Sequence, residues 1–167
     1  MKQILFSLLF AATCITATAQ SDNDTLPYLK YPVMPAFEIL HMDSSTITNT
    51  AYAPKDRPVI FVFFSPDCEH CTITIRELLN NRQELNNAKI YLFTPLTFDK
   101  LKPVYDKLRL ASYKDVVVGK EFRYFFYKFY SPVHVPYIAI YNKKKKLVSV
   151  YDGGTSLEQI VKDVNKD

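Results

Sequence analysis

The sequence predicts one α/β domain in which helices flank a central mixed β-sheet. Two uninterrupted apolar runs, residues 59–64 and 88–94, have the composition of buried strands. The segment between them, 71–86, carries apolar residues at helical spacing, and this strand–helix–strand order implies a right-handed parallel crossover. Residues 137–151 predict a hairpin of two strands joined by a lysine-rich turn, which adds antiparallel pairing.

Weaker patterns predict the elements between these. Residues 37–41 predict a first strand, and residues 47–57 a polar loop that ends at a proline. Residues 99–110 have the apolar spacing of an amphipathic helix. Residues 115–118 predict a short strand at the edge of the sheet.

The segment 121–130 is crowded with aromatic residues, more than one helical face can bury. It predicts a core helix with tyrosine hydroxyls at the surface, and the alternative is that some rings form a docking surface for a partner. After a Gly-Gly break, residues 157–164 predict a C-terminal helix capped by Thr155 or Ser156.

Composition favours a folded domain and argues against a nucleic-acid partner. The chain has 167 residues, of which 48% are hydrophobic, so it can form a core. The formal net charge is +4, and four lysines lie in one run at 143–146. One short basic run is typical of a solvated turn and does not make a basic face.

Residues 1–19 predict a signal peptide. A basic start precedes an apolar stretch at 4–12 that is too short to span a bilayer, and an Ala-Thr-Ala cleavage site follows. We expect residues 20–35 to be an extended lead-in and residues 36–167 to be the main domain. The expected location is periplasmic or otherwise extracytoplasmic.

Cys14 offers a second interpretation of this leader. A lipoprotein signal ends in a cysteine that becomes acylated, but Thr13 and Ala11 make a poor match to the residues that precede such a cysteine. We therefore expect membrane anchoring only if Cys14 is lipidated. Both interpretations place the domain outside the cytoplasm.

Cys68 and Cys71 are the candidate reactive residues. They form a Cys-Glu-His-Cys motif directly after the strand at 59–64, where a helix N-terminus would stabilise a thiolate. If Cys14 leaves with the signal peptide, these are the remaining cysteines, and an oxidising compartment favours a disulfide between them. A bridge that closes so short a loop stabilises a fold little, so redox exchange is favoured over a structural bridge or a metal site.

The order of these features resembles the thioredoxin fold. A buried strand leads into Cys-x-x-Cys at a helix start, a Val135-Pro136 pair precedes the hairpin, and a helix closes the chain. The resemblance covers roughly residues 35–164 and is greatest to the envelope-located branch that includes TlpA and ResA.

The resemblance implies a thiol-disulfide oxidoreductase without a cofactor. Cys68 matches the exposed attacking cysteine, and Cys71 the buried cysteine that resolves the mixed disulfide. Pro136, with Val135 before it, matches the cis-proline loop that offers backbone groups to a substrate strand. The implied partners are protein disulfides and a redox protein that recharges the pair.

Several residues depart from the common thioredoxin pattern. Asp67 stands in place of a tryptophan, Val62 in place of a buried aspartate, and Glu69 and His70 in place of Gly-Pro. His70 would favour the Cys68 thiolate and so the reduced pair, whereas Glu69 and Asp67 would disfavour it. If Cys71 needs a base, it must come from outside this strand, and Glu69 and Asp67 are the nearest candidates in the sequence. The reductase direction follows from the branch that the chain resembles.

Two other functions remain open from the sequence. Cys68, Cys71 and a histidine, either His134 or His70, could bind Cu(I) through soft ligands, although copper carriers of this superfamily use a wider cysteine spacing. Ser65-x-x-Cys68 loosely echoes the peroxidatic pattern of peroxiredoxins, but the upstream proline and an assignable arginine are missing. We expect no bound metal for the leading function.

Overall fold

The computed structural model describes residues 25–166 as a sheet covered by helices on both faces. The predicted signal peptide and Cys14 lie outside these residues. Seven strands form one sheet in the order β2-β1-β5-β4-β3-β6-β7. The strands are β1 (Glu38–His41), β2 (Ile47–Asn49), β3 (Val59–Phe63), β4 (Lys89–Thr94), β5 (Val116–Lys120), β6 (Tyr137–Tyr141) and β7 (Leu147–Asp152).

The predicted mixed sheet is confirmed. The strand β3 runs parallel to β4, which runs parallel to β5, while β6 pairs antiparallel with β3 and β7 antiparallel with β6. All five residues of β3 are buried, as expected for a central strand covered on both faces. The predicted C-terminal hairpin is the β6–β7 pair.

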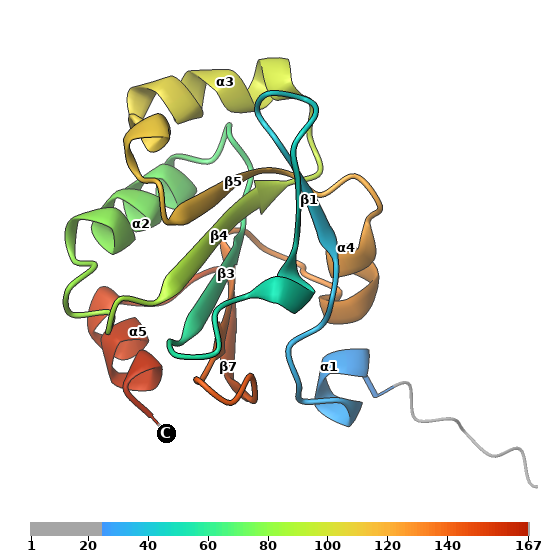
Figure 1. The fold of residues 1–167 in the computed structure, drawn as a ribbon, viewed down its shortest axis with the longest axis vertical. Helices are drawn as coiled ribbons and strands as arrows, with labels where there is room; N and C mark the ends of the chain where they lie inside the picture. Colours follow the sequence, from blue (N-terminus) through green and yellow to red (C-terminus); the bar gives the residue numbers. More distant parts are fainter. Residues whose placement is uncertain (1–24, 167) are drawn as a thin grey trace, which may run out of the picture.

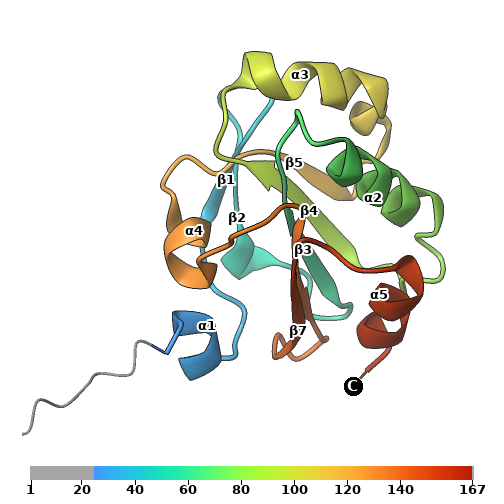
Figure 2. The same ribbon diagram turned by 180° about the vertical axis from the view of Figure 1, so that it is seen from behind.

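The helices are divided between the two faces of the sheet (Figures 1 and 2). Buried apolar side chains of α2, α3 and α5 pack together on one face, and those of α4 pack on the other with Tyr28 of α1. The helices are α1 (Pro27–Lys30), α2 (Glu69–Asn80), α3 (Phe98–Lys107), α4 (Phe125–Tyr130) and α5 (Leu157–Val164), with 3-10 turns at Thr50–Tyr52 and Leu110–Ser112.

The helix that begins within the cysteine motif, α2, is shorter than predicted. Its inner face buries Ile75, Leu78 and Leu79 against the sheet. It ends at Asn80, not at residue 86, because the Asn81 side chain donates to the Glu77 carbonyl at 2.8 Å and an asparagine-rich turn follows. The terminal helix α5 agrees with prediction, and Ser156 is its cap, accepting the Gln159 N–H.

The aromatic segment 121–130 contributes mainly to the core. Phe126 and Tyr130 are buried in α4, and Phe126 packs edge-on against Phe93 of β4. Tyr124 and Tyr127 are both 55% exposed. The interpretation as a core helix with surface tyrosines is therefore confirmed for the shorter span Phe125–Tyr130.

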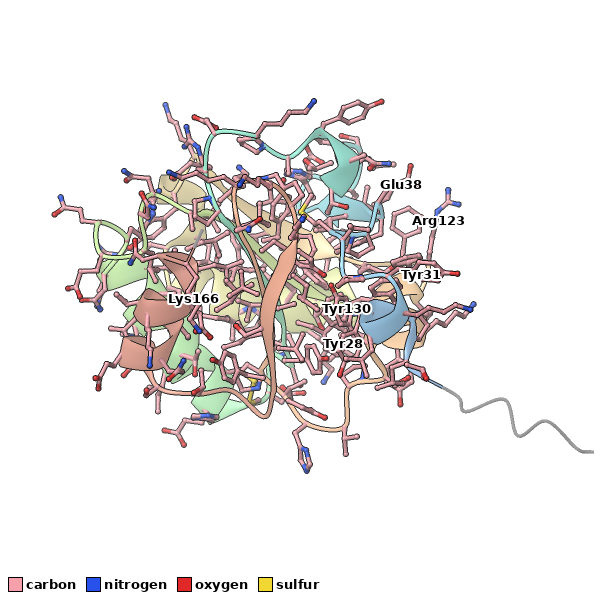
Figure 3. The ribbon with its side chains drawn as sticks, turned by 90° about the horizontal axis from the view of Figure 1, so that it is seen from below. Tyr28, Tyr31, Glu38, Arg123, Tyr130 and Lys166 are labelled. Carbon is pink, nitrogen blue, oxygen red and sulfur yellow. A yellow bond between two sulfur atoms is a disulfide. The ribbon has the colours of Figure 1, made fainter. Side chains whose placement is uncertain are left out.

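The lead-in segment is not extended throughout. Residues 27–30 form α1, where Tyr28 stacks on Tyr130 of α4 with ring centroids 5.4 Å apart (Figure 3). Further along, Val33 forms a bridge with Lys146 of the hairpin turn. Proline at the first helical position and the packing of partly buried Tyr28 against the aromatic core explain this helix, which the sequence pattern does not show.

Two predictions about the sheet are wrong. The segment predicted as a polar loop contains β2, which pairs antiparallel with β1 across a turn held by Asp43. The strand β5 is not at an edge, because β1 pairs with its other side. Gly119 permits that pairing, since a Cβ there would lie 2.1 Å from the Leu40 carbonyl oxygen. No helix among residues 25–166 is long and apolar enough to cross a membrane.

Candidate active site

The cysteine motif lies where the central strand β3 ends and α2 begins. Cys68 is the N-cap of α2, and its Sγ accepts the backbone N–H of Cys71 at 3.0 Å. The two residues form a disulfide, with Cα atoms 5.3 Å apart. The helix therefore directs its unpaired N–H groups and the positive end of its dipole at the first sulfur, an arrangement that stabilises a thiolate once the bridge is reduced.

The two cysteines differ in exposure. Cys71 is 0% exposed and packs in the apolar cluster beneath α2, whereas Cys68 is only partly buried. Asp67, Glu69 and His70 around them are all exposed. A molecule in solution can therefore reach the sulfur of Cys68 more readily than that of Cys71.

The second part of the site is the loop between α4 and β6. The Val135–Pro136 peptide bond is cis, as the resemblance implied. The Val135 carbonyl oxygen lies 3.9 Å from Cys68 Sγ, so the loop faces the motif directly. Val133, two residues earlier, is 77% exposed. The structure thus brings the Cys68–Cys71 pair together with Val135 and Pro136, although Cys68 and Val135 are 67 residues apart in sequence.

His70 points toward the loop that follows β7. A Cβ on Gly154 would lie 3.2 Å from His70 Nε2 and 3.1 Å from Pro136 Cγ, so these three residues meet at one rim of the site. Both Gly153 and Gly154 have positive φ, at 96° and 86°. Glycine provides this backbone conformation and leaves room for the imidazole.

His134 points to a different partner. Its Nδ1 lies 3.8 Å from Asp152 Oδ1, and its side chain is 69% exposed. Within residues 25–166, no group of three His, Cys, Asp or Glu side chains is arranged to hold a metal ion. The arrangement proposed for Cu(I), in which a histidine joins Cys68 and Cys71, is therefore not assembled in this structure.

No carboxylate lies in the strand beneath the cysteines. Val62, at the position of the buried aspartate in thioredoxin, is 0% exposed in β3. The buried acid Glu121 serves the other face, where its carboxylate accepts the N–H groups of Arg123 at 2.8 Å and Phe126 at 3.3 Å. A proton leaving Cys71 must therefore go to a group other than a strand carboxylate.

Asp152 is a residue of this site that sequence reasoning missed. It is the last residue of β7, and its carboxylate accepts the backbone N–H of His134 at 2.6 Å and of Val133 at 3.0 Å. The only sequence signal is its place before Gly153-Gly154, which resembles any strand end.

Comparison with known proteins shows the fold of the chain. No protein-family profile and no curated sequence matches it. Solved structures do match. One is a secreted disulfide oxidoreductase of Mycobacterium tuberculosis homologous to E. coli DsbE, with a TM-score of 0.62 and 12% identity over 77% of this chain and 93% of that one.

Two further structures show the range of proteins with this fold. The exposed lipoprotein thioredoxin Etrx1 of Streptococcus pneumoniae has a TM-score of 0.59 and 18% identity, over 77% of this chain and 99% of its own. The peroxidoxin BcpB of M. tuberculosis has a TM-score of 0.62 and 13% identity, over 79% and 93%. This chain shares the architecture of these solved structures and therefore has the thioredoxin-like fold.

Proposed function

We propose that this protein is an extracytoplasmic thiol-disulfide oxidoreductase that acts on protein disulfides. The observation that carries the proposal is the asymmetry of the cysteine pair. Cys68 is partly exposed at the N-terminus of α2, and Cys71 is buried one helical turn away, with Cys71 N–H 3.0 Å from Cys68 Sγ. An exposed attacking sulfur beside a protected resolving sulfur is the arrangement that disulfide exchange requires.

The exchange balances as follows when the pair begins reduced. The Cys68 thiolate attacks one sulfur of a substrate disulfide, that S–S bond breaks, and a mixed disulfide forms. Cys71 then loses its proton to the departing substrate thiolate and attacks Cys68 Sγ, which releases the second substrate sulfur as a thiolate that takes a proton from solvent. The substrate gains two electrons, the Cys68–Cys71 bridge forms, and a separate dithiol protein returns two electrons to the pair.

The reductase direction is part of the proposal and has its own measurement. The resemblance to the TlpA and ResA branch supports it, as do the exposed acidic groups Asp67 and Glu69 beside Cys68, which oppose a strongly stabilised thiolate. Equilibration with glutathione gives the reduction potential of the pair. A value of about −270 mV supports a reductase, and a value of about −120 mV supports an oxidase.

The location outside the cytoplasm rests on the N-terminal sequence. We propose residues 1–19 as a cleaved signal peptide, a lead-in from residue 20 and a domain from residue 36, with lipidation at Cys14 as the alternative. Cell fractionation, with the mass of the mature N-terminus, tests both. An N-terminus at Gln20 supports cleavage, and a lipid-modified N-terminal Cys14 supports the anchor.

Trapping of substrates tests the proposed chemistry. Cys71→Ser leaves Cys68 able to attack but unable to be released, so it should accumulate mixed disulfides with extracytoplasmic proteins. These adducts should disappear on treatment with a reductant. Cys68→Ser is the matched control, since the one thiol of the motif that it retains is that of the buried Cys71. Equal trapping by both variants, or by neither, would contradict the proposed order of attack.

A further inference from the structure

The loop that faces Cys68 is held in place from the far strand of the hairpin. Residues 131–136 connect α4 to β6, and the N–H groups of Val133 and His134 face the end of β7. There Asp152 Oδ1 accepts the His134 N–H at 2.6 Å and the Val133 N–H at 3.2 Å, and Oδ2 accepts the Val133 N–H at 3.0 Å. One carboxylate thus binds two successive N–H groups of the loop.

Asp152 is itself well anchored. In the register of the β6–β7 pair it lies opposite Tyr137, the residue directly after Pro136. Gly153 and Gly154 continue the chain against His134 and Pro136, where a Cβ would come within 3.4 Å of His134 Cβ and 3.1 Å of Pro136 Cγ. The carboxylate therefore links a regular strand to the segment before the cis-proline. Hydrogen bonds to an ionised acceptor are shorter and stronger than neutral ones.

The consequence concerns Val135. Its carbonyl oxygen faces Cys68 Sγ at 3.9 Å, and among residues 25–166 no group accepts a hydrogen bond from its N–H. Asp152 accepts the N–H groups of Val133 and His134, the two residues before Val135, and does not bind the N–H of Val135 itself. A free N–H and C=O beside a reactive sulfur can pair with an extended polypeptide, as in the addition of a strand.

We propose that Asp152 is a positioning residue that makes this site select disulfides within extended polypeptide segments over small disulfides. The inference rests on the proposed function. Glutathione disulfide needs only access to the partly exposed Cys68 sulfur, so it gains little from an ordered loop. A polypeptide that pairs with the Val135 backbone loses affinity when Val133 and His134 are no longer held.

Substitution of Asp152 separates the two substrate classes. In Asp152→Ala we expect kcat/KM for a disulfide-linked peptide to fall about tenfold, mainly through KM, because two charge-assisted hydrogen bonds to the loop are lost. The rate with glutathione disulfide should stay within about twofold, and the reduction potential should be unchanged, since Asp152 contacts neither sulfur. Asp152→Asn keeps one acceptor oxygen, so its kcat/KM for the peptide should lie between that of the wild type and that of Asp152→Ala.

Asp43→Ala is the matched control. Asp43 also accepts two backbone N–H groups, those of Ser45 at 2.9 Å and Thr46 at 2.8 Å, but in the β1–β2 turn. We expect it to lower the melting temperature and to leave the peptide-to-glutathione rate ratio unchanged. If Asp152→Ala slows both substrates equally, or if Asp43→Ala changes the ratio as much, the positioning role is wrong.

Amide hydrogen exchange gives a readout independent of turnover. In Asp152→Asn, exchange at Val133 and His134 should rise while exchange in β6 does not, and an unchanged rate at both amides would overturn the inference. The wild-type protein tests the proposed function separately. If it exchanges with neither glutathione disulfide nor the peptide, the oxidoreductase function fails, whereas normal glutathione exchange with an unaltered ratio in the variant refutes only the role of Asp152.

Discussion

The backbone N–H of Cys71 donates to Sγ of Cys68 at 3.0 Å, so the first turn of α2 binds the sulfur that is the more exposed of the two. This contact opposes the effect of the flanking acids, because an N–H donor and the positive end of a helix dipole favour a thiolate. Both influences act on the same atom, and their balance is measurable in the reduced protein.

Replacement of Glu69 shifts that balance in a known direction. Glu69 is exposed in the first turn of α2, and its negative charge disfavours a neighbouring thiolate. In Glu69→Gln, alkylation of reduced Cys68 at neutral pH should become about two- to threefold faster, a modest change because solvent screens an exposed charge. The midpoint of the rate–pH profile should move to lower pH. Glu77→Gln, on the exposed face of the same helix, should change neither, and a slower reaction in Glu69→Gln would contradict the electrostatic argument.

Gly154 controls the space between His70 and Pro136. In Gly154→Ala the new Cβ would lie 3.1 Å from Pro136 Cγ and 3.2 Å from His70 Nε2, at a φ of +86° that disfavours a side chain. We expect a loss of about 1–2 kcal/mol in the free energy of unfolding, together with slower disulfide exchange. Urea unfolding and an exchange assay measure the two effects.

Gly153→Ala is the control for backbone strain. Gly153 has a similar φ, +96°, but its Cβ would lie 3.4 Å from His134 Cβ, an ordinary contact. The strain should therefore lower stability in both variants, while the additional crowding affects Gly154→Ala. Equal loss of exchange in the two variants would show that crowding against His70 and Pro136 has no part in the effect.

The sequence predicts the elements whose signals are local, and it misses those that depend on distant contacts. The strand β3 is an unbroken apolar run, and the cysteine motif follows it directly, so both are visible in the sequence. By contrast, β2 covers only three residues, of which none is buried, and it exists because it pairs with β1. The helix α1 likewise depends on the stacking of Tyr28 on Tyr130, about a hundred residues away.

The candidate site follows the same division. The sequence places the cysteines at a helix start, and the resemblance to thioredoxin adds the cis-proline loop. The sequence does not show that Asp152 binds Val133 and His134. This contact is made by a side chain and joins a strand end to a loop 18–19 residues earlier in the chain. Nor does it separate the two histidines, of which His70 lies at the Pro136 rim and His134 beside Asp152.

Asp163 makes stability depend on pH in the acid range. Burial alone would raise the pKa of this carboxyl, but hydrogen bonds from Lys166 and Tyr151, with Gln159 at 3.1 Å, lower it to about 2. A carboxyl with a depressed native pKa stabilises the fold above its unfolded pKa, and the stabilisation is lost as pH falls to the native value. The contribution should therefore disappear between about pH 4 and pH 2.

The substitution Asp163→Asn tests this dependence. At pH 7 we expect a loss of about 1–3 kcal/mol, since the residue is 1% exposed and its partners lose an ionised acceptor. Between about pH 4 and pH 2 the stability of the variant should fall less steeply than that of the wild type. Asp106→Asn removes an exposed carboxylate paired with Lys102 at 2.8 Å and should cost under about 0.5 kcal/mol. Parallel pH profiles for Asp163→Asn and wild type would refute the assignment.

The hydroxyls of Tyr130 and Tyr141 bond to each other inside the aromatic core, and both residues are almost fully buried. Burial raises the pKa of both phenols, so they stay neutral and paired in the native state. Tyr141→Phe leaves the Tyr130 hydroxyl without this partner and should cost about 1–3 kcal/mol, and Tyr130→Phe should do the same. The double variant removes both polar groups and should lose less than the sum of the single losses.

Urea unfolding of the wild type, the two single variants and the double variant measures this coupling. Tyr127→Phe, on the exposed side of α4, is the control and should change the free energy of unfolding by close to zero. Additive losses would show that the two hydroxyls do not depend on each other.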